Sequence, residues 1–136
     1  MIIGLTEKDR KDIVKFRLEK ANETFAEILI LIENKFYRTA ANRLYYACYY
    51  AVSALLVKDG HTARFHNGVF SVFGREFVVA GIISKEQNRL YRNLFNLRQG
   101  GDYGDWFEVK EEDVKDFIAP AEQFINTIEN LINENK

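Results

Sequence analysis

The sequence contains almost no cysteine. Cys48 is the only one among 136 residues, so neither an intrachain disulfide nor a zinc site built from cysteines can form. Such sparing use of cysteine fits a reducing cytoplasm, where we expect the protein to be found. We also expect no cofactor and no bound metal, because His61 and His66, the two histidines, lack the three- or four-residue spacing of ligands on one helix face.

Net charge is nearly absent as well. The chain has 19 Lys and Arg residues against 20 Asp and Glu residues, which leaves a formal charge of −1 at pH 7. This balance argues against attraction of nucleic acid by the whole surface, but it is compatible with a local basic cleft.

Long apolar runs are missing too. The most apolar run, residues 25–32, is about eight residues long and contains Glu27, whereas a membrane-spanning helix needs roughly 20 apolar residues. The first residues show no basic segment followed by a long apolar stretch. We therefore expect neither a signal peptide nor contact with a membrane.

The sequence is rich in apolar residues at helical spacing. Along 14–32 and 37–55 they recur every three or four residues, which is the pattern of one face of a long helix. The pattern predicts an all-α fold, an up-and-down helical bundle of about five helices, four long and one short. We place these helices, within a single domain over 1–136, at about 6–33, 36–58, 66–79, 84–98 and 110–133.

Individual residues mark the expected helix ends. Thr6 is a predicted N-cap, and Ser84 followed by Gln87 predicts a capping box. Asn34 and Lys35 mark the end of the first helix. The later helices are expected to end at glycines, namely Gly60, Gly81 and the pair Gly100–Gly101, with a loop over 102–109.

Two segments allow a further prediction each. Pro120 should kink the last helix, because its ring clashes with the carbonyl of Asp116. Residues 77–83 are rich in β-branched side chains, so a strand is the alternative to a helix end there.

Two motifs go beyond generic helix patterning. Residues 42–51 read NRLYYACYYA, and residues 98–103 read RQGGDY. Together they resemble the HEPN superfamily, in particular a small stand-alone branch marked by an (S/N)RxYYAxxYA helix and an RxxxDY helix end. The resemblance covers roughly 37–103 by motif and nearly the whole chain by helix order.

The resemblance implies a function as well as a fold. It implies a homodimer with a cleft between the second and fourth helices of each subunit. It also implies a minimal nucleotidyltransferase as partner in a toxin–antitoxin-type system, with Tyr103 of the RxxxDY end as the residue that this partner adenylylates. Many HEPN proteins are metal-independent ribonucleases that use an Arg-x(4–6)-His motif.

This sequence departs from that ribonuclease motif. Neither His61 nor His66 follows an arginine at the required spacing, and no histidine follows Arg98. Asp102 and Tyr103 stand where the histidine would fall, and their ordinary pKa values of about 3.9 and 10 make them a poor acid and a poor base near neutral pH. Arg98, Asp102 and Tyr103 are the catalytic candidates of a nuclease hypothesis that the missing histidine weakens.

We predict a structural role for His66, at the start of the third helix.

The leading hypothesis is a module that binds a nucleotide or an RNA phosphate. Arg98 can hold a phosphate through two parallel hydrogen bonds. Asn42, Arg43 and Tyr46 share neighbouring faces of the second helix and should line the cleft with Tyr103.

Simpler explanations remain for the same residues. Arg98 could pair with Asp102, and the tyrosines of the second helix could be core residues with satisfied hydroxyls. The whole chain could then be a non-catalytic dimerising scaffold.

Overall fold

The computed structural model describes residues 6–61, 65–103 and 108–134; the side chains of 65, 67 and 101–103 are not among the described parts. These residues form helices joined by short turns, without a strand in the described ranges. The elements are α1 (Glu7–Ala26), α2 (Ile28–Glu33), α3 (Tyr37–Lys58), α4 (Phe65–Phe73), the π-helical turn η1 (Gly74–Val78), α5 (Lys85–Tyr103), α6 (Glu111–Lys115) and α7 (Ile118–Glu134).

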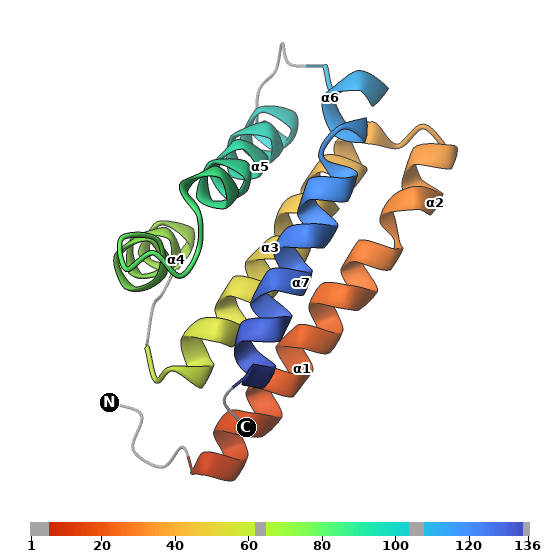
Figure 1. The fold of residues 1–136 in the computed structure, drawn as a ribbon. Coiled ribbons are helices and arrows are strands. Elements are labelled where there is room, and N and C mark those ends of the chain that lie inside the picture. Colours follow the sequence, from red (N-terminus) through yellow and green to blue (C-terminus); the bar gives the residue numbers. More distant parts are fainter. Residues whose placement is uncertain (1–5, 62–64, 104–107, 135–136) are drawn as a thin grey trace.

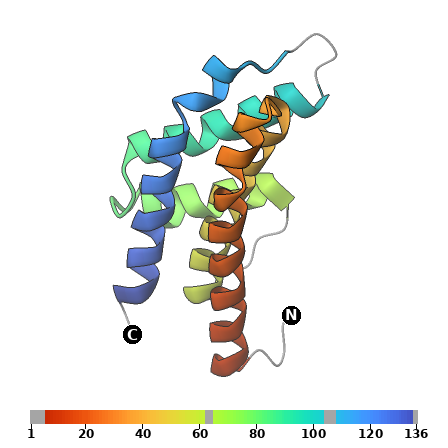
Figure 2. The same ribbon diagram turned by 90° about the vertical axis from the view of Figure 1, so that its right-hand side faces the viewer.

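Helix α3 is the centre of the bundle. It packs against α1, α5 and α7, and the two ribbon views show α1, α3 and α7 running side by side, with α5 across the remaining side of α3 (Figures 1 and 2). Many of its buried residues are small, among them Ala47, Ala51 and Ala54, so its neighbours can approach closely. The all-α bundle predicted from the sequence is confirmed. No helix in the described ranges is long and apolar enough to cross a membrane.

The predicted first and second helices have the expected ends. Thr6 and Asp9 form a reciprocal capping box at the start of α1. After α2 the backbone turns at Lys35, whose φ of 62° is unusual for a residue with a side chain. Helix α3 is followed by Gly60 at φ 80°, a conformation that glycine adopts without strain. One difference is a break at Glu27, whose N–H donates to Thr24 O, three residues back, and so tightens the turn.

The third helix ends in a different way from the expectation. α4 changes into the wider turn η1 at Gly74, and the chain then leaves through Gly81 at φ 81°. The strand considered for 77–83 is not formed, because Ile82 and Ile83 donate their N–H groups to Phe77 O at the end of the helical turn.

The fourth helix is longer than predicted. α5 begins after Ser84, whose Oγ accepts the N–H of Gln87 as expected, but it continues through Gly100 and Gly101 to Tyr103. The prediction that these glycines stop the helix and begin a loop at Asp102 is wrong. A glycine costs a helix interior only about 1 kcal/mol relative to alanine, and buried residues of α5 such as Leu94 already hold it against the bundle. Residues 104–107 of the expected loop lie outside the described part.

Pro120 divides the last helix. The helix expected over 110–133 is separated into α6 and α7 at Asp116 and Phe117, and Pro120 lies in the first turn of α7. The interruption therefore falls at Asp116, the residue whose carbonyl would accept a helical hydrogen bond from residue 120, because proline has no N–H to donate. The effect expected of Pro120 is confirmed, as a break between two helices.

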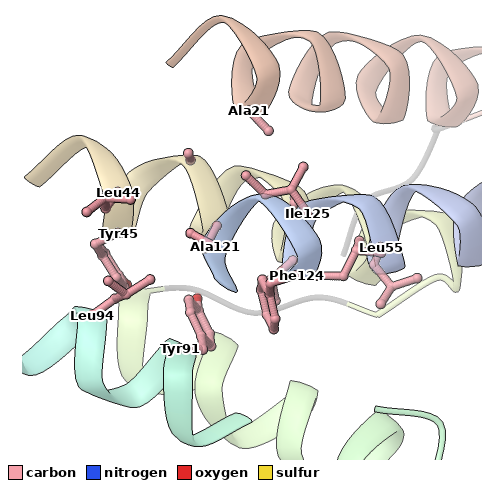
Figure 3. Packing of buried hydrophobic residues seen from close by; sticks show 14 of the residues in the cluster. Ala21, Leu44, Tyr45, Leu55, Tyr91, Leu94, Ala121, Phe124 and Ile125 are labelled. Carbon is pink, nitrogen blue, oxygen red and sulfur yellow. The ribbon is translucent and has the colours of Figure 1, made fainter. Parts of the chain in front are cut away.

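A stack of aromatic rings joins the three helices at the core. The Tyr45 ring on α3 stacks on Tyr91 of α5 with centroids 5.8 Å apart, and Tyr91 stacks on Phe124 of α7 at 5.6 Å. Figure 3 shows Tyr45 pointing from α3 toward Tyr91 and Leu94. Phe73 of α4 meets both Tyr91 and Phe124 edge-on. These contacts hold α3, α4 and α5 at the place where the site described next is formed.

Candidate functional site

Arg98 is a buried arginine in the last part of α5. Only 7% of its surface is exposed, and its guanidinium carbon lies 5.4 Å from the centroid of the Tyr45 ring and 5.2 Å from that of Tyr46. Arg98 lies one helical turn after Leu94, which packs in the core, and this spacing turns its side chain toward α3. The cationic group thus rests on the electron-rich faces of two adjacent tyrosines.

His66 of α4 joins this arginine from a distant part of the sequence. Its Nδ1 and the Tyr45 hydroxyl are hydrogen-bonded at 2.6 Å. Its ring lies 4.8 Å from that of Tyr49 and 5.8 Å from that of Tyr46. Arg98, His66, Tyr45 and Tyr46 therefore form one cluster, here called the Arg98 cluster, to which α3, α4 and α5 each contribute.

The cluster controls the charge of its members. Burial lowers the pKa of His66, and the positive charge of Arg98 lowers it further. Burial also raises the pKa of Tyr45, which keeps its hydroxyl protonated. At neutral pH the cluster therefore combines a fixed cation, a neutral imidazole that can accept a proton and a phenol that stays a hydrogen-bonding group.

Arg43, a predicted ligand-binding residue of α3, lies near the break between α1 and α2. Arg43 donates from Nη1 to Asn42 Oδ1 at 3.1 Å, and its Nε lies 3.8 Å from the Glu27 carboxylate in a half-exposed ion pair. The structure thus brings the predicted residues Arg98 and Tyr46 together, whereas it directs Arg43 toward the break between α1 and α2.

The RxxxDY segment is helical from Arg98 to Tyr103. The side chains of Asp102 and Tyr103, which the sequence offered as catalytic and ligand-binding candidates, lie outside the described part of the structure. Among the described side chains of that motif, Arg98 belongs to the cluster.

The tyrosines of α3 divide into two groups. Tyr45 is fully buried, whereas Tyr46, Tyr49 and Tyr50 are half-buried and pack against the core with part of their surface exposed. The core explanation therefore applies to Tyr45, and the exposed parts of the other three remain available for contacts.

His66 is the site residue that sequence reasoning missed. No short spacing relates it to Arg98, and its position at the start of a predicted helix suggested only a structural role. In fact it does lie at the start of α4, in a turn that α3 and α5 cover. Among the described residues, no group of three His, Cys, Asp or Glu side chains could hold a metal ion.

Comparison with known proteins gives a consistent picture. The family model described as the HEPN domain matches residues 14–131. The UPF0332 protein of Thermotoga maritima is 40% identical over 128 residues, which cover 94% of this chain and 97% of that protein. Two proteins of Methanocaldococcus jannaschii, each named "Putative toxin", are 34% and 30% identical; the matches cover 96% and 87% of this chain and 97% and 81% of theirs.

The coupling between His66 and Arg98 is directly measurable. The Arg98→Ala variant should raise the pKa of His66, because it removes the nearby positive charge and opens the imidazole to water. NMR titration of the imidazole C–H signals, in a His61→Gln background that leaves one histidine, measures this pKa. The matched control is Arg89→Ala, an exposed arginine on the opposite side of α5. An equal pKa in both variants would mean that the two groups do not interact.

Proposed function

The chain belongs to the HEPN domain family, and from this premise we propose that it is a toxin-like HEPN module that binds the phosphate of a nucleotide or of RNA at the Arg98 cluster. The observation that supports this most strongly is the buried Arg98 guanidinium held over Tyr45 and Tyr46 beside His66. The toxin names of two relatives that span nearly the same length agree with it.

The chemistry of the cluster suits a phosphate ester. A guanidinium offers a planar set of N–H donors that matches phosphate oxygens, and its interaction with an anion is strengthened where water is partly excluded. The half-buried Tyr46 ring gives a nucleobase a surface on which to stack, next to the same cation. Phosphate binding and base stacking would thus occur at adjacent groups of α5 and α3.

The family also supplies a regulatory context for the proposal. In this context the module is a homodimer that acts with a minimal nucleotidyltransferase, and the partner transfers an adenylyl group to Tyr103. Tyr103 is the last residue of α5, on the same helix as Arg98. An added nucleotide at that end of α5 would place a new phosphate near the helix that carries Arg98.

A second candidate function, metal-independent cleavage of RNA, is favoured by His66. When Nδ1 carries the imidazole proton and donates it to the Tyr45 hydroxyl, Nε2 can accept the proton of a ribose 2′-hydroxyl. The 2′-oxygen then bonds to phosphorus, the bond from phosphorus to the 5′-oxygen breaks, and that oxygen takes a proton from water. Arg98 would stabilise the added negative charge on the phosphorane. His66 thereby takes the proton-transfer role for which the sequence offered only Asp102 and Tyr103.

Binding is the first test of the main proposal. The Arg98→Ala variant should lose at least about tenfold in affinity for a nucleoside monophosphate, and Arg98→Lys should recover only part of it, because an ammonium lacks the planar set of donors. Isothermal titration calorimetry measures both, with Arg89→Ala as the charge-matched control and thermal melting as a check on folding. Equal affinity in the wild type and Arg98→Ala would contradict the proposal and favour the explanation that the chain is a non-catalytic dimerising scaffold.

Cleavage in EDTA tests the nuclease candidate. Wild-type protein should degrade single-stranded RNA to 2′,3′-cyclic phosphate ends, and His66→Gln should slow this by about 100-fold or more. The rate should rise with pH and level off below the ordinary histidine value of about 6.5, because the pKa of His66 is lowered. Intact RNA after incubation with the wild type would exclude this candidate and leave the binding proposal standing.

Intact-mass spectrometry tests the regulatory part. Incubation with a minimal nucleotidyltransferase and ATP should add one adenylyl group to the wild type and none to Tyr103→Phe. A wild-type mass that stays the same would remove the modification from the proposal.

A further inference from the structure

The aromatic surface of the Arg98 cluster continues along α3. The Tyr46 ring lies 5.9 Å from that of Tyr50 and 6.0 Å from that of Tyr49, and Tyr49 lies 6.0 Å from Tyr50. All three rings are half-buried, so each keeps part of its surface at the outside of the bundle. Together they form a row, here called the tyrosine row, that begins at Arg98 and leads away from it.

Helix α1 places cations along the other end of this row. Lys20 is exposed, and its Nζ lies 5.2 Å from the centroid of the Tyr50 ring. Arg17 donates from Nη1 to Ser53 Oγ on α3 at 3.1 Å. The positive charge of Arg17 also acts on Tyr49, where it opposes the rise in pKa that burial causes. The tyrosine row is therefore bordered by cations at both ends, Arg98 on α5 and Lys20 with Arg17 on α1.

The charged residues beside the tyrosine row indicate which way along α3 a bound anionic chain would run. Glu27, at the break between α1 and α2, is paired with Arg43, which precedes Tyr46 on α3. From Tyr46 onward, two cations of α1 contact α3, Lys20 at the Tyr50 ring and Arg17 at Ser53 Oγ. In one direction along α3, an anionic chain that starts at Arg98 would meet Arg43, whose charge Glu27 already neutralises. In the other direction it would meet the positive charges of Lys20 and Arg17.

We infer that the tyrosine row with Arg17 and Lys20 is a binding track for single-stranded RNA. This inference rests on the proposed function, since it extends the ligand of the Arg98 cluster from one phosphate to several nucleotides. Unpaired bases stack on aromatic rings, and flanking phosphates are neutralised by Lys and Arg; this combination is how proteins hold single strands. A paired helix would keep its base faces covered, so the track selects against duplex RNA.

The experiment compares the wild type with two double variants, first on a single-stranded RNA and a mononucleotide. Arg17→Ala/Lys20→Ala removes the cations of the track, and Lys11→Ala/Lys15→Ala removes two charges from the opposite, exposed side of the same helix. Fluorescence anisotropy gives the affinity for a labelled single-stranded RNA hexamer, and calorimetry gives that for a nucleoside monophosphate. The hexamer should bind the wild type and the Lys11/Lys15 control equally well, and the Arg17/Lys20 variant about tenfold or more weakly.

Mononucleotide affinity should be unchanged in both double variants, because one phosphate engages Arg98 alone. The single variant Lys20→Glu, at an exposed position with little effect on folding, should weaken hexamer binding in the same sense. A duplex of the same sequence should bind the wild type more weakly than the single strand.

The outcomes separate the inference from the proposed function. If the wild type binds the mononucleotide and the hexamer, but the hexamer binds the Arg17/Lys20 and Lys11/Lys15 variants equally, the track is overturned and the Arg98 site stands. Equal binding of duplex and single strand would also overturn it. If the wild type binds no nucleotide and no RNA, the proposed function itself fails.

Discussion

A charged guanidinium enclosed by protein is costly unless other groups replace the water that it loses. Arg98 meets this condition in the interior of the bundle, with two tyrosine faces against its guanidinium. The arrangement requires Tyr45 and Tyr46 at the facing turn of α3, and Tyr45 is in turn held by its stack on Tyr91. The position of α5 on α3 and the shape of the site therefore depend on the same contact.

The same contact gives the site its proton chemistry. Tyr45 is packed beneath Arg98 and hydrogen-bonded to His66, so one buried ring links the cation to the imidazole. The nearby positive charge and burial both favour the neutral imidazole. The relation between an arginine and a histidine, which the ribonuclease motif would provide within a few residues of the sequence, is formed here between α5 and α4. A site of this kind is visible only once the chain is folded.

The sequence allowed the helices to be predicted where local chemistry decides them. The Thr6 cap, the turn after α3 and the break before Pro120 follow from hydrogen bonds, φ angles and ring sterics that act within a few residues. The continuation of α5 through Gly100 and Gly101 could not be predicted in this way. Packing against the bundle outweighs the weak helix preference of two glycines, and the local pattern carries no information about that packing.

The site was predictable in part for the same reason. Arg98 and Tyr46 stand in recognisable motifs, and the structure brings them together. His66 and the α1 cations Arg17 and Lys20 belong to no motif, and their neighbours lie on other helices. Their roles depend on tertiary distances that no spacing along the chain records.

The most direct measurement is a crystal structure of the protein with a bound nucleoside monophosphate. We expect the phosphate within hydrogen-bonding distance of the Arg98 guanidinium, the base stacked on Tyr46, and the ribose next to His66. A phosphate bound away from Arg98, with the contacts of Arg98 to Tyr45 and Tyr46 unchanged, would contradict the account.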